Sequence, residues 1–232
     1  MLENIKAIFF DADNTIVDHK ECERQALEYL FKSIGVSYKQ EYQEIFRPLD
    51  RDLWDGVALN KCSIPKELIP EYRFKVLFDK IHIEYNNYKK ANQLFQDGLE
   101  QSVALIEKAD EVIEYLYNKN YKLYVVTNGL IRLQKPRIIN STIADYFSDI
   151  IVSEEVGVAK PNPKIFDVLL QRSNLKPNEA IVVGDSLEKD IQGAKNANIK
   201  SVWYNPMQKD NNTAIVPDYE INNLLELKNL FR

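Results

Sequence analysis

Two aspartates follow the first apolar run of the sequence. Residues 9–15 read FFDADNT, so Asp11 and Asp13 come directly after bulky apolar side chains. Carboxylates can act as nucleophiles, as general acids and bases, or as ligands of a divalent cation. For each aspartate considered alone, a turn or a helix N-cap is the competing explanation. The choice between these interpretations depends on which other polar side chains gather around the pair.

Short apolar runs predict the elements that would position them. Runs rich in Val, Ile and aromatic residues predict strands over residues 5–10, 122–127, 149–153, 180–185 and 201–205. Their continuous apolarity is typical of a parallel sheet that is covered on both faces. Helical spacing in residues 102–119, 163–173 and 188–198 alternates with these strands, and residues 215–231 predict a short strand and a closing helix. The fold class predicted is α/β, with a Rossmann-like parallel sheet.

The stretch from residue 18 to residue 98 interrupts this alternation. It has helical spacing in residues 21–34, 41–57 and 66–81, with no convincing strand between them. We therefore predict a catalytic core formed by residues 1–17 and 99–232, and an inserted helical domain formed by residues 18–98.

Polar side chains stand at the predicted carboxyl ends of the strands, where open α/β sheets bind their ligands. These side chains are Asp11, Asp13, Thr127, Asn128, Asp185 and Ser186, with Asp190 one turn further on and Lys160 in the loop after the third strand. If the loops converge, several carboxylates share one small pocket and oppose each other's ionisation. A divalent cation would resolve this conflict, and Mg²⁺ prefers such oxygen ligands together with a substrate phosphate.

Four short motifs, in this order, resemble the haloacid dehalogenase-like (HAD) superfamily of phosphohydrolases. They are DADNT at 11–15, VVTNG at 125–129, KPNP at 160–163 and GDSLEKD at 184–190. The helical insert resembles the C1 cap of that family, and the phrases SEEVGVAKPNPKIF and VVTNG are closest to the YjjG-like pyrimidine 5′-nucleotidases. One departure is that Glu107, Lys108 and Ala109 stand where many members have a Pro-Gly pair.

The resemblance implies a role for each strand-end residue. Asp11 would be the nucleophile that forms an aspartyl phosphate, and Asp13 would be the general acid and base. The remaining roles are phosphate binding by Thr127, Asn128 and Lys160, and binding of Mg²⁺ by Asp11, the backbone carbonyl of Asp13 and Asp185, with support from Asp190 and Ser186. The alternative explanation of Ser186 is a cap for the helix that begins near Leu187.

The function implied is that of a Mg²⁺-dependent phosphomonoesterase, with nucleoside 5′-monophosphates as the expected substrates. A sugar-phosphate phosphatase or a phosphomutase of the same superfamily is the alternative. A 2-haloacid dehalogenase is disfavoured because it needs no proton-shuttling Asp13. A catalytically silent binding module is disfavoured because Asp11, Asp13, Lys160 and Asp185 are all present.

Composition restricts the partners. The net charge is −5, which provides no basic footprint for a nucleic-acid polymer. No apolar stretch approaches the roughly 20 residues that cross a bilayer, so we expect a cytoplasmic protein. The resemblance implies that its partner is a small phosphomonoester substrate. Cys22 and Cys62 are isolated and are expected to be ordinary thiols. The sequence predicts no oligomeric state.

Side chains of the insert offer weaker candidates for substrate contacts. Its aromatic residues, Phe46, Trp54, Tyr72, Phe74 and Phe78, have the helical spacing of a small bundle core, although such rings can also stack on a nucleobase. Arg47, Arg51 and Arg73 are candidates for phosphate or base contacts, although surface salt bridges are the favoured explanation. His19 follows the first motif closely and is a candidate for the site entrance, but neither His19 nor His82 is expected to belong to the site.

Overall fold

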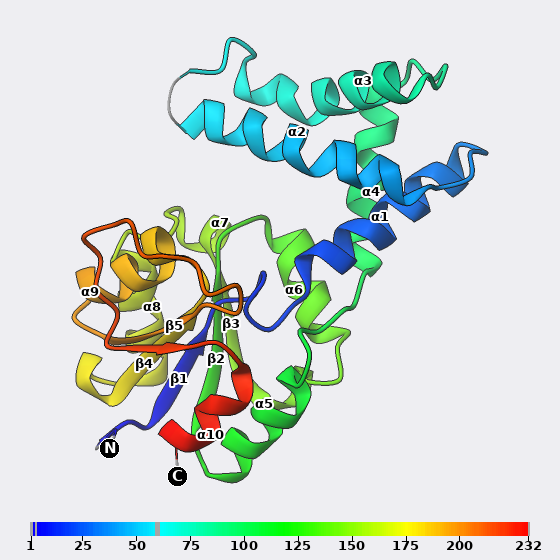
Figure 1. Ribbon diagram of the computed structural model, residues 1–232. Helices are drawn as coiled ribbons and strands as arrows, with labels where there is room; N and C mark the ends of the chain where they lie inside the picture. The colour runs from blue at the N-terminus through cyan, green and yellow to red at the C-terminus, as the bar shows by residue number, and fades with distance from the viewer. Residues whose placement is uncertain (1, 3, 59–60, 232) are drawn as a thin grey trace. The chain divides into compact units, whose positions relative to one another are not determined.

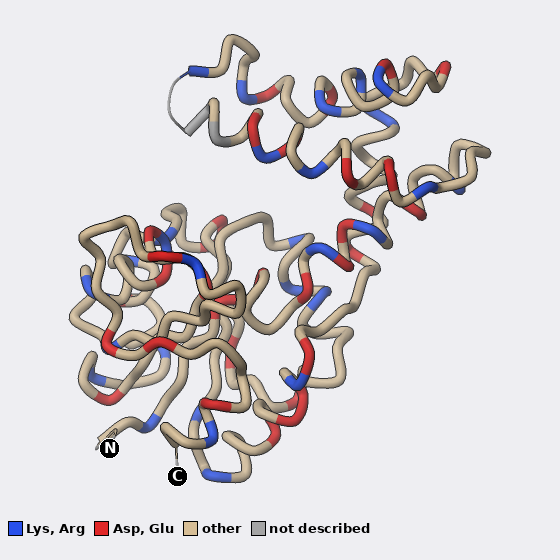
Figure 2. Tube along the Cα trace, in the orientation of Figure 1, with Lys and Arg blue, Asp and Glu red and all other residues tan. Residues whose placement is uncertain are grey.

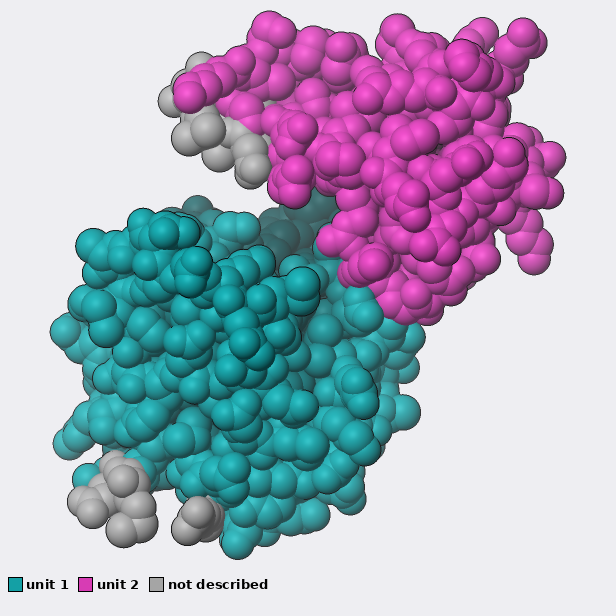
Figure 3. Space-filling model, viewed as in Figure 1, with its two compact units in different colours: residues 1–19, 103–232 teal, residues 20–102 magenta. Residues whose placement is uncertain are grey.

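The chain forms two compact units, coloured separately in Figure 3. The computed structural model describes residues 2, 4–58 and 61–231. We call Met1–His19 with Val103–Arg232 the sheet unit, and Lys20–Ser102 the helical unit. The assignment of residues 18–98 as a cap domain stays a prediction.

The sheet unit contains a six-stranded sheet in the order β3-β2-β1-β4-β5-β6 (Figure 1). The strands are β1 (Ala7–Phe10), β2 (Lys122–Thr127), β3 (Phe147–Val152), β4 (Ala180–Gly184), β5 (Lys200–Tyr204) and β6 (Tyr219–Ile221). Every neighbouring pair is parallel. The α/β fold class with a Rossmann-like parallel sheet is therefore confirmed.

Helices connect and cover these strands (Figure 1). They are α5 (Ala109–Asn118), α6 (Ile131–Ile139), α7 (Ser153–Val156), α8 (Lys164–Ser173), α9 (Gln192–Asn196) and α10 (Leu227–Leu230), with a π-helix at Leu187–Ile191 and 3₁₀ turns at Ala144–Tyr146, Pro177–Glu179 and Leu224–Glu226. Phe166 of α8 packs with Phe9 of β1 and Val182 of β4 in one buried cluster. Burial of such a side chain contributes about 1.5–3 kcal/mol, so the apolar runs that predict the strands also stabilise the sheet.

The helix predicted over residues 102–119 begins only at Ala109. The prediction is wrong for residues 102–108, because this segment pairs with the segment that follows β1. The amide of Ile106 donates to Ile16 O at 3.0 Å, and Asp18 N donates to Ala104 O at 2.9 Å. Lys108 then adopts a left-handed conformation with φ of 65°, which a helix interior does not accommodate.

The helical unit contains α1 (His19–Ser33), α2 (Gln40–Ala58), a 3₁₀ turn (Lys66–Leu68), α3 (Ile69–Ile81) and α4 (Tyr88–Gln101). No helix is predicted over α4, because this segment is mostly polar and its narrow apolar face, which includes Leu94 and Phe95, gives a weak periodic signal. An added Cβ at Gly98 would lie 2.8 Å from Ala26 Cα, so α4 approaches α1 at a distance that only glycine allows.

Aromatic rings form the core of the helical unit. Phe46, Phe74 and Phe78 are fully buried or nearly so, and the rings of Phe46 and Phe74 stack with centroids 5.4 Å apart. The guanidinium of Arg73 lies over the rings of Phe46 and Phe74 and donates to Asp50 Oδ1 at 2.8 Å. These three rings and Arg73 thus stabilise the bundle.

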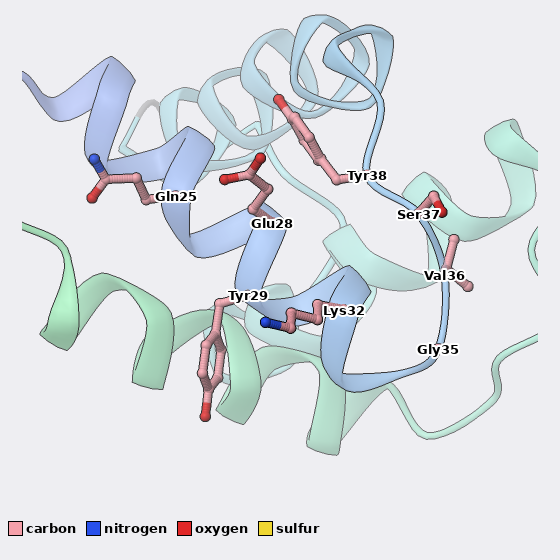
Figure 4. A pocket seen from close by; sticks show the side chains of 8 residues that line it. All are labelled: Gln25, Glu28, Tyr29, Lys32, Gly35, Val36, Ser37 and Tyr38. Carbon is pink, nitrogen blue, oxygen red and sulfur yellow. The ribbon is translucent and has the colours of Figure 1, made fainter.

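An open groove of about 690 Å³ lies within the helical unit. Figure 4 shows Glu28 and Lys32 of α1 on its wall, with Tyr38 of the following loop. Acidic and basic residues are interspersed along both units (Figure 2). Among the described residues, no helix is both long and apolar enough to cross a membrane.

Candidate active site

Three carboxylates meet at the carboxyl end of the sheet. Asp11 follows β1 and Asp185 follows β4, which is the direct neighbour of β1. Asp11 N donates to Val183 O at 2.9 Å, which continues the ladder between these strands. Asp190 joins them from the π-helix, and one carboxylate oxygen from each of the three lies within 4.8 Å of the others. The parallel register therefore brings together the acids predicted from strand ends.

Lys160 lies against this acidic cluster and is only 4% exposed. Its Nζ lies 2.5 Å from Asp11 Oδ1 and 2.7 Å from Asp190 Oδ1. The same Nζ donates to Val126 O at 2.8 Å. The ammonium group thus has two hydrogen-bond acceptors and a second carboxylate in ion-pair contact. The predicted lysine is thus a buried charge whose position is set by the cluster.

Asn128 holds the backbone of Lys160. Its Nδ2 donates to Lys160 O at 3.1 Å, and its Oδ1 accepts from Lys160 N at 2.8 Å. This two-bond bracket joins the end of β2 to the lysine loop. The sequence predicts only a phosphate contact for Asn128, because a contact across 32 residues leaves no local signal. Thr127 precedes it at the end of β2 and is 1% exposed.

The cluster carries more negative charge than one lysine balances. Burial raises the pKa of Asp11 to about 8, against the opposing effect of Lys160, and the neighbouring Asp190 and Asp185 add to the rise. Burial and the charge of Asp190 raise the pKa of Asp185 to about 6. Burial alone would lower the pKa of Lys160, but Asp11 and Asp190 hold it above its ordinary value. These directions describe a site that favours either a proton or a further cation.

The oxygen cluster fits Mg²⁺. Magnesium takes carboxylate and carbonyl oxygens in a compact shell, and the three carboxylates converge with too little positive charge to neutralise them. A cation there would remove the like-charge repulsion that raises the pKa values of Asp11 and Asp185.

Gly184 makes room for Asp190. An added Cβ at Gly184 would lie 2.4 Å from Asp190 Cγ, so this carboxylate rests on the bare backbone at the end of β4. Asp190 Oδ2 accepts from Ser186 N at 3.1 Å. The hydroxyl of Ser186 accepts from Lys189 N at 3.2 Å and caps the π-helix. Ser186 thus has the capping position that is the alternative to a role in metal binding.

Asp13 has a separate set of partners. Its Oδ1 lies 2.7 Å from Arg137 Nη2 and 3.4 Å from His19 Nδ1. Its Oδ2 accepts from Gln134 Nε2 at 2.8 Å. Burial opposes ionisation of Asp13, but Arg137 and His19 prevail and hold its pKa well below the usual range. The two aspartates of the first motif therefore have opposite electrostatic environments.

Three residues around Asp11 and Asp13 have no role predicted from the sequence: Thr15, Gln134 and Arg137. Gln134 and Arg137 are one helical turn apart on α6, so they share a face. Both side chains are buried. Their spacing alone does not reveal this, because polar residues at the same spacing are also common on a solvated helix face. Thr15 donates from Oγ1 to Asp11 Oδ2 at 3.2 Å.

The position of His19 differs from the expectation that this residue lies outside the site. Its ring lies beside Asp13, at the start of α1. The reason is that residues 12–18 fold back on themselves, with Ile16 N and Val17 N both donating to Ala12 O at 3.0 and 2.9 Å. This compact turn returns the chain toward Asp13.

Comparisons with known proteins agree with this arrangement. A family model described as haloacid dehalogenase-like hydrolase matches residues 8–204. The pyrimidine 5′-nucleotidase PynA of Streptococcus pneumoniae is 32% identical over 217 residues, covering 93% of this chain and 90% of that protein. The pyrimidine 5′-nucleotidase YjjG of Escherichia coli is 30% identical over 224 residues, covering 96% of each chain.

A solved structure gives the same result for the fold. The magnesium-bound crystal structure of the HAD-hydrolase YfnB from Bacillus subtilis aligns with a TM-score of 0.87 at 29% identity, covering 99% of this chain and 100% of that one. The family match extends over most of the sheet unit and includes all four motifs. The chain therefore belongs to the haloacid dehalogenase-like hydrolases.

Proposed function

We propose that this enzyme is a Mg²⁺-dependent phosphomonoesterase that hydrolyses nucleoside 5′-monophosphates through an aspartyl phosphate on Asp11. The observation that carries the proposal is the convergence of Asp11, Asp185 and Asp190 around the buried ammonium group of Lys160. A nucleophilic carboxylate beside a fixed cation and a metal-binding oxygen cluster is suited to an anionic electrophile such as a phosphoryl group.

Asp11 is oriented from both of its oxygens. Lys160 contacts Oδ1 and Thr15 donates to Oδ2, so the carboxylate is held while one oxygen attacks phosphorus. The P–O bond to the leaving group breaks as the bond to Asp11 forms. Lys160 offsets the negative charge that nucleophile and phosphoryl group bring together.

Asp11, Asp185 and the backbone carbonyl of Asp13 are the groups that would hold Mg²⁺, with Asp190 beside them. When bound, the ion would stabilise charge on the phosphoryl oxygens and help to align the substrate. Thr127 Oγ and Asn128 N–H, at the end of β2, are proposed to donate to the remaining phosphoryl oxygens.

Asp13 is proposed to carry the proton. The dianionic phosphate of a bound substrate would oppose Arg137 and His19 and favour a proton on Asp13. In the first half of the reaction Asp13 donates this proton to the departing alkoxide, and in the second half it takes one from the water that attacks the aspartyl phosphate. The two transfers cancel, so the products are an alcohol and inorganic phosphate.

The nucleotide preference rests on relatives. PynA and YjjG, both named pyrimidine 5′-nucleotidases, match this chain over at least nine-tenths of its length. A dehalogenase would attack carbon and would need neither a metal-binding acid cluster nor a proton carrier. The geometry around Asp185 and Asp13 therefore supports phosphorus chemistry.

The test is phosphate release from a panel of nucleoside monophosphates and sugar phosphates, with Mg²⁺ or with EDTA. We expect release that requires the metal, is fastest with pyrimidine nucleoside monophosphates and is abolished in Asp11→Asn. Faster release from sugar phosphates would overturn the substrate assignment while keeping the mechanism. No release from any ester, or full activity of Asp11→Asn, would overturn the mechanism.

A further inference from the structure

We infer that Gln134 and Arg137 of α6 are positioning residues that hold Asp13 in place for proton transfer. This inference rests on the proposed phosphomonoesterase function. It assigns to one face of α6 a task in the reaction that is distinct from phosphate and metal binding.

Arg137 holds one oxygen of Asp13. Its side chain is 3% exposed, and its Nη2 lies 2.7 Å from Asp13 Oδ1. A buried arginine has lost its water, so loss of its ion pair with a carboxylate would leave an uncompensated charge. Asp13 itself is partly exposed, with a side-chain exposure of 26%. The carboxylate is thus anchored from behind while part of it stays accessible.

Gln134 holds the other oxygen and ties it to the end of β2. Its Nε2 donates to Asp13 Oδ2 at 2.8 Å and to Asn128 O at 3.4 Å. Gly129 packs directly on this amide, since an added Cβ there would lie 3.0 Å from Gln134 Nε2. Gly129 also has φ of 144°, a conformation that a side chain would strain. The turn after β2 is therefore shaped around Gln134.

These contacts join the two aspartates through a continuous series of side chains. Asp13 contacts Gln134, Gln134 contacts Asn128 O, and the amide of Asn128 brackets the backbone of Lys160. Lys160 in turn contacts Asp11. The separation of proton carrier and nucleophile thus depends on α6 and the lysine loop as well as on the backbone of residues 11–13. Proton transfer needs heavy atoms within about 2.6–3.2 Å, and a 1 Å misplacement can cost about 100-fold in rate.

A comparison of two leaving groups distinguishes the positioning of Asp13 for proton transfer from a general structural role of Gln134 and Arg137. An alkoxide leaves well only when it is protonated, whereas p-nitrophenolate leaves without a proton. Since kcat/KM reports the steps up to the first irreversible one, it isolates transfer of the phosphoryl group to Asp11. Loss of Asp13 positioning should therefore lower kcat/KM for an alkyl ester far more than for p-nitrophenyl phosphate.

The experiment compares a nucleoside 5′-monophosphate with p-nitrophenyl phosphate in wild type, Arg137→Met, Arg137→Lys and Gln134→Met. We expect the alkyl ester to lose at least about tenfold more kcat/KM than the aryl ester in Arg137→Met and Gln134→Met. Arg137→Lys should recover part of the loss because it keeps a buried cation. Gln134→Met removes only a neutral donor, so it carries the test if Arg137→Met does not fold.

Arg73→Met is the matched control. Arg73 is also buried and also donates to an aspartate at 2.8 Å, but it lies in the core of the helical unit. The Arg73→Met variant should have a lower melting temperature than wild type, with an unchanged ratio of kcat/KM for the two esters. Equal losses on both esters in Gln134→Met and Arg137→Met, or a selective loss in Arg73→Met, would overturn the inference. If wild type hydrolyses neither ester with Mg²⁺, the proposed function fails and the inference with it; an active wild type with unselective variants overturns the inference alone.

Discussion

Lys160 Nζ lies 2.5 Å from Asp11 Oδ1 although the two residues are 149 positions apart in the chain. Both side chains are buried, with exposures of 2% and 9%. A buried ion pair of this kind is costly to break, because the partner that remains keeps an uncompensated charge. The pair therefore links the stability of the sheet unit to its chemistry.

Replacement of Lys160 by Ala should reduce stability and activity together. We expect a loss of about 3–5 kcal/mol in the free energy of unfolding, because Asp11 and Asp190 lose their shared cation. Turnover should fall and KM should rise. Urea denaturation and steady-state kinetics measure these effects. Lys164→Ala, at an exposed position, is the control and should change the unfolding free energy by less than about 0.5 kcal/mol. A Lys160→Ala protein with wild-type stability would refute the buried-pair interpretation.

Replacement of Asp185 by Asn should stabilise the metal-free protein. The pKa of Asp185 is raised to about 6, so its ionised form is less favourable in the folded chain than in the unfolded one at neutral pH. Removal of that charge should raise the unfolding free energy by an amount on the order of 1 kcal/mol. The same variant should lose the rise in melting temperature that Mg²⁺ produces in wild type. Thermal denaturation with Mg²⁺ and with EDTA tests both parts, and a lower melting temperature in EDTA than that of wild type would contradict the first.

Binding of Mg²⁺ should release protons and weaken as the pH falls. The metal needs ionised carboxylates, whereas Asp11 and Asp185 have pKa values raised to about 8 and about 6 in the metal-free protein. Protons therefore compete with the metal below pH 8, and affinity should fall again as the pH passes below 6. Calorimetric titration at pH 7 in buffers of different ionisation enthalpy measures the released protons. An affinity that is independent of pH between 6 and 8 would contradict the prediction.

Replacement of Gly184 by Ala should displace Asp190. The new methyl group would lie 2.4 Å from Asp190 Cγ, so the carboxylate must move away from Lys160. We expect a cost of about 1–3 kcal/mol in unfolding free energy and a clear loss of turnover. Asp190 Cβ itself would lie 2.5 Å from the new methyl group, so only removal of the whole side chain relieves the clash. In the double variant with Asp190→Gly the two effects on stability should therefore be less than additive. Strict additivity in denaturation experiments would show that the clash is absent.

Local sequence patterns suffice to predict the sheet and the acids at its edge. Continuous apolar runs mark buried parallel strands because each strand must be covered on both faces. The polar residues directly after those runs, such as Asp11 and Asp185, then meet because parallel neighbours end at the same edge of the sheet. Local pattern sufficed here, since strand order and direction leave little freedom to the first residue after a strand.

The residues that surround Asp13 and the side chains that support Lys160 depend on tertiary packing. Gln134 reaches Asp13 across 121 residues, and the position of His19 depends on how residues 12–18 turn back. Partners of this kind follow from how α6 packs and from the shape of a compact turn, which no periodicity in the sequence encodes. The amide of Asn128 illustrates the same limit: its place in the chain predicts a strand end, but its bracket on Lys160 exists only once two distant loops lie side by side.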